Sequence, residues 1–295
     1  MYIKLEGTFV MYAKQRARKL TRKTIESYIV SLTEEEKSTA TITKYTYDLN
    51  MAAKHFGGAE LTKPILIEWK NALIENYAAA TVNSILAALN GFLKHMGWND
   101  LRVKPLKIQK ALFQDEKREL TQAEYKRLVL AAERTNNRRL SLVLQTICAT
   151  GIRVSELKYI TAEAVRTGHT EINNKGKRRT IFLPKKLRRL LYKYLKETNK
   201  TEGVIFVTRS GKPLDRSNIW RDMKALCESA DVDPNKVFPH NLRHLFARTY
   251  YSIEKDLSRL ADILGHSNVN TTRIYTMESG AVHAHQIEKL GLIIT

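Results

Sequence analysis

The chain has 295 residues, 43% of them hydrophobic, which is enough for two domains with separate cores. Lys and Arg number 50 against 30 Asp and Glu, and the formal net charge of +20 favours a polyanionic partner such as nucleic acid. A merely soluble basic protein, or one that meets anionic membranes, is the alternative. Cys148 and Cys227 are too few and too far apart for a zinc site or a disulfide framework. The longest early apolar run, residues 8–13, is too short for a signal-peptide core or a membrane span.

The first third of the chain predicts a leader followed by helices. Residues 1–20 show weak periodicity, and we expect a mobile basic leader there. Apolar residues then recur at helical spacing in four segments. These segments are 25–32, 42–56 (ending at Gly57-Gly58), 62–73 (with Pro64 in its first turn) and 80–96 (with Gly97 as its stop). Short connections favour a separate N-terminal helical bundle over residues 21–112.

A break in periodicity marks the boundary between the two predicted domains. Residues 103–118 contain Pro105 and end in a charged run, so we place a linker at 113–118. Thr121 and Glu124 then form a capping box that begins a new helix. The second domain is expected to span residues 119–295.

The second domain contains one clear β region. Residues 170–173 and 178–183 flank the turn-prone Asn174-Lys175-Gly176, and residues 204–207 are a candidate third strand. The rest has helical patterns. The sequence therefore predicts a mainly α domain with a small antiparallel β-sheet, in the α+β class.

Six polar residues of the second half suit chemistry on a phosphodiester. A nucleophile must attack, charge on the non-bridging oxygens must be neutralised, and the departing oxygen must gain a proton. Two arginines, a lysine and two histidines meet the last two demands, and a tyrosine hydroxyl meets the first. The six are Arg153, Lys175, His240, Arg243, His266 and Tyr275. No carboxylate cluster that would hold a metal accompanies them.

Each of these residues also has a plainer interpretation. Arg153 follows Gly151 and would be an ordinary surface arginine, and Glu156 either orients it or forms a solvated pair with it. Lys175 is either a solvated turn lysine or a proton donor, with Lys177 as its rival.

The histidines of the later helix allow a further alternative. His240 and His244 are spaced i and i+4, as zinc ligands are, but no Glu lies between them and Arg243 would repel the ion. We therefore expect no metal, and we interpret His244 as structural. Tyr250 and Tyr251 are expected to pack inside.

In order and spacing, the six residues resemble the tyrosine recombinases, the phage-integrase and Xer-like enzymes that cut and rejoin DNA. The resemblance is densest in residues 150–157 and 264–275, and the patterns at 43–49 and 81–83 resemble the core-binding domain of that family. It implies that Arg153 and Arg243 clamp the scissile phosphate while His240 and His266 support the transition state and proton transfer. It also implies that Lys175 is the general acid, that Tyr275 forms a 3′-phosphotyrosyl link, and that Glu156 supports the first arginine.

The resemblance further implies a compact two-domain, C-shaped DNA clamp without a cofactor. Its partner would be double-stranded DNA target sites, and four protomers would meet on synapsed DNA through an exchanged C-terminal tail. The free protein would be a monomer or weak dimer, cytoplasmic and nucleoid-associated, and would not bind membranes. Residues that we predict to contact DNA are Lys44, Asn83, Lys177, Arg179 and Arg221.

Three other functions compete with this hypothesis. A type IB topoisomerase would share the chemistry, and a sequence-specific DNA-binding protein would never cut. A metal-dependent nuclease would need clustered Asp and Glu.

Overall fold

A computed structural model describes residues 2–5, 8–11, 17–108, 118–174, 177–266, 268–276 and 288–289. The chain divides into two compact units, residues 1–110 and 111–295. Of the expected linker, only Arg118 is described. Of the chain after Tyr275, which includes the expected C-terminal tail, only residues 276, 288 and 289 are described. Within the described ranges, no helix has the length and apolar character needed to cross a membrane.

The first unit begins with a hairpin where the sequence predicted a mobile leader. Strand β1 (Tyr2–Leu5) pairs antiparallel with β2 (Thr8–Met11). Aromatic and β-branched residues dominate both strands, and such residues favour paired extended backbone. Leu20 is buried in the core of the unit, so the last residue of the predicted leader belongs to the helical bundle, and the mobility of residues 1–20 stays a prediction.

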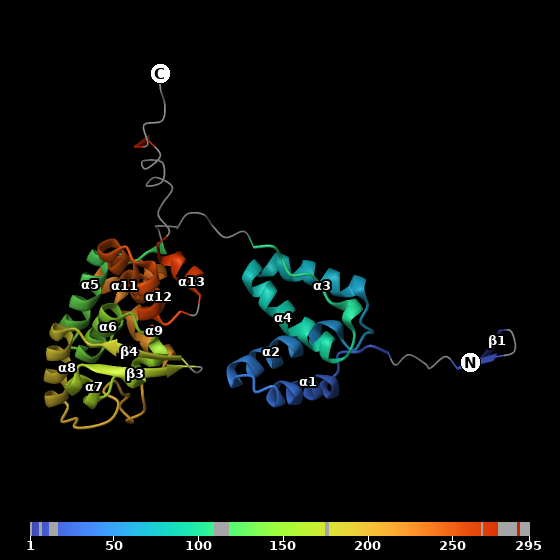
Figure 1. The fold of residues 1–295 in the computed structure, drawn as a ribbon, viewed down its shortest axis with the longest axis horizontal. Helices are drawn as coiled ribbons and strands as arrows, with labels where there is room; N and C mark the ends of the chain where they lie inside the picture. Colours follow the sequence, from blue (N-terminus) through green and yellow to red (C-terminus); the bar gives the residue numbers. More distant parts are fainter. Residues whose placement is uncertain are drawn as a thin grey trace, which may run out of the picture. The chain divides into compact units, whose positions relative to one another are not determined.

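The four helices predicted for the first unit are present (Figure 1). They are α1 (Arg22–Glu34), α2 (Thr39–Phe56), α3 (Lys63–Asn76) and α4 (Ala79–His95), followed by the 3-10 helix η1 (Asn99–Leu101). Gly57 ends α2 in the left-handed conformation, and Pro64 lies in the first turn of α3. The apolar faces of all four helices share one core.

Two asparagines of α4 hold the extended segment that follows η1. The Asn83 amide donates to the Leu106 carbonyl at 2.9 Å and accepts from the Leu106 N–H at 2.7 Å. Asn90 makes the same pair of bonds with Val103, at 2.8 Å each. Because the two asparagines are seven residues apart, they share one face of the helix and fix the segment at two points.

The second unit is mainly helical, with one small sheet (Figure 1). Its elements are α5 (Gln122–Arg134), α6 (Arg138–Thr150), η3 (Val154–Tyr159), α7 (Ala162–Thr167), β3 (His169–Asn174), β4 (Lys177–Phe182), α8 (Lys185–Glu197), α9 (Arg216–Ala225), α10 (Cys227–Ala230), η4 (Pro234–Lys236), α11 (Pro239–Glu254), α12 (Leu257–Leu264), α13 (Val269–Arg273) and η5 (Ile274–Thr276). Helix α6 is the central element, because α5, α8, α9 and α11 all pack against it. The capping box predicted at Thr121 and Glu124 begins α5.

Strands β3 and β4 form a two-stranded antiparallel sheet that runs from the pair His169 and Phe182 to the pair Asn174 and Lys177. The candidate third strand at residues 204–207 was wrong. Among the described residues this segment makes only isolated bridges, to Thr161 and Pro213. Its apolar side chains instead enter the helical core, which takes the segment away from the sheet.

Candidate active site

Arg243 is a buried arginine that joins the ends of two helices. It lies on α11, its side chain is among the most buried in the unit, and its residue exposure is 1%. Nη1 donates to the Gly151 carbonyl at 2.5 Å, and Nη2 donates to the Leu264 carbonyl at 2.7 Å. Gly151 caps the C-terminus of α6, and Leu264 is the last residue of α12. A cation is favoured at these helix ends because their last carbonyls are unpaired and carry partial negative charge.

The protonated state of Arg243 survives this burial. Burial and nearby Arg153 together lower the pKa of Arg243 to about 10, and contact with Tyr275 opposes them. The guanidinium therefore stays charged at neutral pH. In the described part of the chain its Nε atom has no hydrogen-bond partner, which leaves one donor for another group.

Glu156 is a buried carboxylate that holds Arg153. It accepts from the Arg153 backbone N–H at 2.7 Å and from Arg153 Nη1 at 3.1 Å. The Glu156 residue is 2% exposed, whereas the Arg153 side chain is 35% exposed. The structure thus places Glu156 where it orients an arginine that still reaches solvent.

Arg179 supports the same carboxylate, so its assignment as a DNA contact needs correction. Its Nη2 lies 2.5 Å from Glu156 Oε2, and its Nη1 donates to the Ile263 carbonyl at 2.8 Å. Its side chain is 11% exposed. Side chains alternate along a strand, and Arg179 shares a face of β4 with buried Ile181. Burial also lowers the pKa of Arg179, against the effect of Glu156.

Tyr275 lies in η5 with its ring enclosed by histidines. Its residue exposure is 4%. The His266 ring stacks on it at 5.7 Å with an interplanar angle of 21°, and the His244 ring meets it edge to face at 4.6 Å and 88°. The His240 ring centroid is 6.3 Å away. Histidines from α11 and from the loop after α12 thus surround one phenol.

His240 and His266 are held in their neutral forms. Partial loss of solvent around the two rings, together with neighbouring positive charges, lowers the pKa of each to about 4. Arg243 and Arg153 act on both rings. At neutral pH both imidazoles are therefore hydrogen-bond partners rather than cations.

Five of the six predicted catalytic residues, all but Lys175, lie in the region around Arg243 and Tyr275. Lys175 and the side chain of Lys177 lie outside the described residues. His244, interpreted from the sequence as structural, instead touches Tyr275. In the described part of the chain, no group of three or more metal-ligating side chains occurs around His240 and His244 or elsewhere.

Two predicted DNA contacts of the first unit have structural roles. Asn83 uses its amide on Leu106, which corrects its assignment. Lys44 lies 2.5 Å from the carboxylate of Asp48, which is 2% exposed, so the ammonium balances a buried charge. In the second unit, the Arg221 side chain on α9 is 72% exposed and keeps its availability for DNA.

The sequence reasoning missed several supporting residues. Side chains alternate along a strand, and Arg179 lies two residues before the apolar Ile181. This spacing could have indicated that Arg179 faces the core. Thr272, whose Oγ1 lies 2.8 Å from His266 Nδ1, gave no signal, because a buried threonine in a short helix is common. The Glu119 carboxylate also gave none.

Comparison with known proteins identifies the family of the chain. Residues 118–280 match the phage integrase family. The chain is 30% identical to tyrosine recombinase XerA of Thermococcus kodakarensis over 85% of this chain and 89% of that protein. It is 28% identical to tyrosine recombinase XerA of Pyrococcus furiosus over 94% of this chain and 97% of that protein.

A solved structure shows the same fold. The crystal structure of a lambda integrase tetramer bound to a Holliday junction matches with a TM-score of 0.72 at 19% identity, over 88% of this chain and 78% of that one. The family match covers more than half of the chain, and the XerA matches cover nearly all of it. The chain therefore belongs to the phage integrase family and is a tyrosine recombinase, an enzyme of site-specific DNA recombination.

Proposed function

We propose that this recombinase cuts DNA with Tyr275 and stores the phosphodiester bond energy in a 3′-phosphotyrosyl link. The observation that carries the proposal is the enclosure of the Tyr275 ring by His266, His244 and His240, next to the buried guanidinium of Arg243. A tyrosine that only fills an apolar core does not need three histidines and an arginine around its ring. The attacked phosphorus would accept the phenol oxygen and release a 5′-hydroxyl.

The scissile phosphate would bind between Arg153 and Arg243. Arg153 is half-exposed and anchored by Glu156, while Arg243 is fixed by two helix ends. Two prearranged guanidinium groups would neutralise the non-bridging oxygens as the phosphorus becomes five-coordinate. His266 and His240, both neutral, would donate or accept protons around that group.

Lys175 would supply the proton for the departing 5′-oxygen. It lies in the sequence between the last paired residues of β3 and β4, Asn174 and Lys177. Lys177 remains its rival. A substrate with sulfur at the 5′-bridging position tests the assignment, because a thiolate leaves without a proton. We expect that substrate to rescue Lys175→Ala and not Lys177→Ala.

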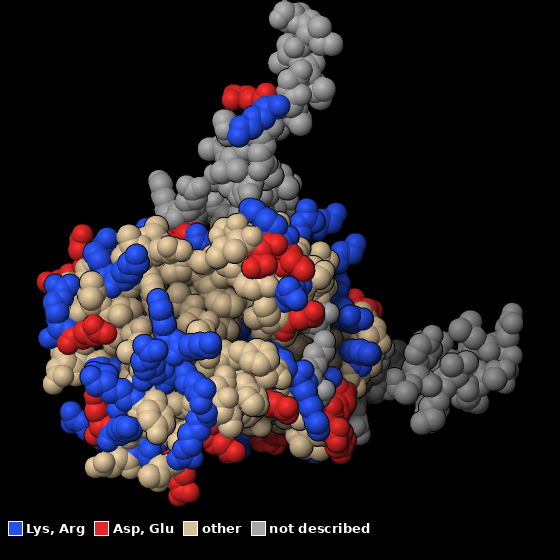
Figure 2. All heavy atoms as spheres, turned by 60° about the vertical axis from the view of Figure 1, so that its left-hand side comes forward, with Lys and Arg blue, Asp and Glu red and all other residues tan. Residues whose placement is uncertain are grey.

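The two units would grip duplex DNA as a C-shaped clamp, and four protomers would exchange strands through a Holliday junction. Figure 2 shows a cluster of Lys and Arg side chains on part of the visible surface, with Asp and Glu side chains around it, and such a basic cluster suits a polyanion. Arg221 and Lys177 would contact DNA on the second unit. The lambda integrase structure is a tetramer on such a junction, which supports the assembly. Exchange of the C-terminal tail between protomers belongs to the same proposal.

A nicked target duplex tests the nucleophile. Incubated with EDTA, the wild type should become covalently attached to the 3′ end, and Tyr275→Phe should bind the same DNA without any adduct. Tyr250→Phe is the matched control, because Tyr250 packs on the same small core as Tyr275. An adduct in Tyr275→Phe would overturn the assignment. DNA binding by the wild type without any adduct would favour the non-cutting alternative.

A further inference from the structure

In the second unit, a short segment, residues 118–121, is tied to helix α11. The side-chain amide of Asn241 donates to the Arg118 carbonyl at 2.8 Å. Arg248 Nη2 donates to the Leu120 carbonyl at 2.7 Å. These bonds connect residues more than 120 positions apart in the sequence. The segment where the chain enters the catalytic unit is therefore fixed against the helix that carries His240 and Arg243.

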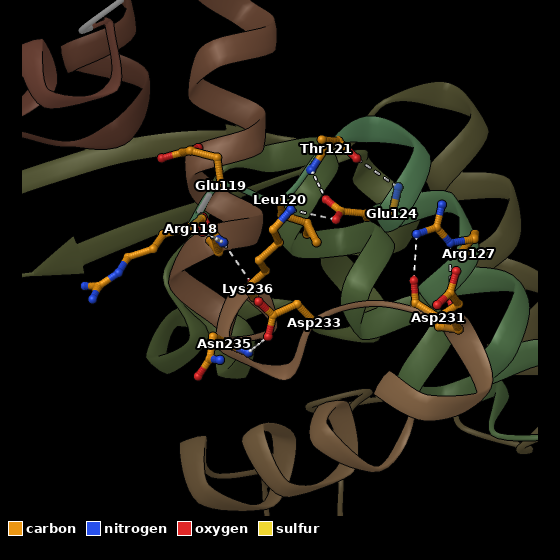
Figure 3. Close-up of polar contacts among 12 residues, drawn as sticks. Arg118, Glu119, Leu120, Thr121, Glu124, Arg127, Asp231, Asp233, Asn235 and Lys236 are labelled. Carbon is orange, nitrogen blue, oxygen red and sulfur yellow. Dashed lines mark hydrogen bonds and ion pairs between the residues drawn. The ribbon is translucent and has the colours of Figure 1, made fainter. Parts of the chain in front are cut away.

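The other side of this segment is fixed as well. Thr121 and Glu124 cap α5, and Lys236 Nζ lies 2.8 Å from Glu124 Oε1 (Figure 3). Figure 3 also shows that the Glu119 side chain points away from Glu124 and Lys236. The backbone at Glu119 is therefore held in place, and the Glu119 side chain contacts residues other than Glu124 and Lys236.

Two of those partners belong to α11. Glu119 is 8% exposed, and its Oε2 lies 2.7 Å from Arg248 Nη2. Its Oε1 lies 3.6 Å from Nδ1 of His244. This Nδ1 is buried and has no hydrogen-bond partner among the described residues. A carboxylate at this distance attracts an imidazole N–H and favours the tautomer with its proton on Nδ1.

His244 carries that contact to the nucleophile. Its ring edge faces the Tyr275 ring, with centroids 4.6 Å apart and planes at 88°. The same ring packs against His240 at 4.7 Å. An edge-to-face contact is directional, so the orientation of the His244 ring restricts that of the phenol.

We propose that Glu119 is a positioning residue for the nucleophile, acting through His244. Held by Arg248, its carboxylate fixes the His244 ring, and that ring fixes the Tyr275 phenol in its attacking orientation. Glu119 touches no reacting atom. The inference rests on the proposed role of Tyr275, and it predicts a defect in the rate of attack rather than in DNA affinity.

Glu119→Gln tests the inference, because it removes the charge and keeps the shape. Glu124→Gln is the matched control, since Glu124 lies on the same stretch but pairs with Lys236 instead. In single-turnover cleavage of the nicked duplex, Glu119→Gln should slow adduct formation about tenfold with an unchanged Kd for DNA, while Glu124→Gln should cleave at the wild-type rate. A sulfur-substituted 5′ position should not rescue Glu119→Gln, because the defect lies on the nucleophile side.

A double-mutant cycle separates positioning from general stability. His244→Phe keeps a ring against Tyr275 but removes Nδ1, so adding Glu119→Gln to it should cause no further loss of rate. Independent losses that multiply in the double variant would overturn the proposal. Equal rates for Glu119→Gln and the wild type would overturn it too, and so would a Glu119→Gln protein that loses DNA binding and stability together. If the wild type itself formed no adduct, the proposed function would fail before this inference was reached.

Discussion

Nη2 of Arg243 lies 2.9 Å from Nε2 of His266. A guanidinium can only donate, so Nε2 must accept and the imidazole proton must sit on Nδ1. Nδ1 lies 2.8 Å from Oγ1 of Thr272, which is fully buried and accepts that proton's hydrogen bond. Arg243 therefore sets the tautomer of His266, Thr272 holds the ring by accepting from Nδ1, and His266 in turn contacts the arginine that is proposed to bind the scissile phosphate.

Thr272→Val should slow cleavage of the nicked duplex without weakening DNA binding. Valine keeps the volume but leaves the Nδ1 proton of His266 unpaired, at a cost of about 1–3 kcal/mol. Thr272→Ser keeps the hydroxyl and should retain a rate close to that of the wild type. Equal rates for the valine and serine variants would contradict the tautomer argument. Adduct formation in a single turnover measures both.

Stability should fall as the pH drops from about 7 to 5. The pKa values of His240 and His266 are about 4 in the folded protein, below the ordinary 6.5. Between these values the unfolded chain binds protons that the folded chain does not, so the stability of the neutral form is complete above pH 6.5 and is lost toward pH 4. Because His240 is exposed, solvent screens its share, and His266 should dominate.

Thermal unfolding across this pH range measures the effect. The midpoint of His266→Gln should depend less steeply on pH than that of the wild type, because glutamine does not titrate. Identical slopes for the two proteins would show that His266 does not carry the dependence.

Glu156→Gln should impair both cleavage and folding. The neutral amide would leave the guanidinium of Arg179, with an 11% exposed side chain, without its counterion, and breaking a buried pair typically costs about 3–5 kcal/mol. Glu171→Gln, on an exposed position of β3, is the control and should behave like the wild type. Urea unfolding and single-turnover cleavage report the two effects. A Glu156→Gln protein with wild-type stability would disprove the role of this carboxylate as the shared anchor.

Gly151→Ala should be more damaging than Gly211→Ala, although both glycines are left-handed. Gly151 has φ +66°, and an added Cβ would lie 2.4 Å from Cδ1 of Phe246. Gly211 has φ +79° with nothing within 4 Å, so Gly211→Ala should cost only the backbone strain of about 1–2 kcal/mol. The alanine at 151 should add a packing cost of about 1–3 kcal/mol.

This clash should also lower activity. The Gly151 carbonyl holds Nη1 of Arg243, so a shift of the α6 end moves the proposed phosphate site. Urea midpoints and cleavage rates of the two alanine variants give the comparison. Equal losses of stability would contradict the predicted contact with Phe246.

Asn83→Ala should destabilise the first unit rather than change which DNA is bound. It removes two hydrogen bonds to Leu106, each worth about 0.5–1.5 kcal/mol. Asn90→Ala should have a similar effect through Val103, and the exposed Asn50 on α2 supplies a neutral control. Thermal unfolding and binding of target and random DNA measure the outcome. A loss of target preference with unchanged stability would restore the role predicted from the sequence.

The sequence alone predicted the helices and the hairpin of β3 and β4, and it singled out the six polar residues. Local rules suffice for these features, because a helix is visible in the spacing of apolar residues such as Ile85, Leu89 and Phe92, and its end is visible in a glycine. The order of the motifs then indicated the family. The hairpin at residues 2–11 was missed because its alternation is short, and the third strand was wrong because an apolar run does not reveal its partners.

Only the tertiary structure decided what each polar side chain contacts. Arg179 and Asn83 looked like DNA contacts because charge and amide groups are usually exposed, yet Arg179 pairs with Glu156 and Asn83 with a neighbouring backbone. Glu119 and Thr272 gave no local signal, because their partners lie on α11 and at His266. Periodicity records which face of a helix is buried, whereas a hydrogen bond between distant residues depends on how the helices pack, and that information is spread over the whole chain.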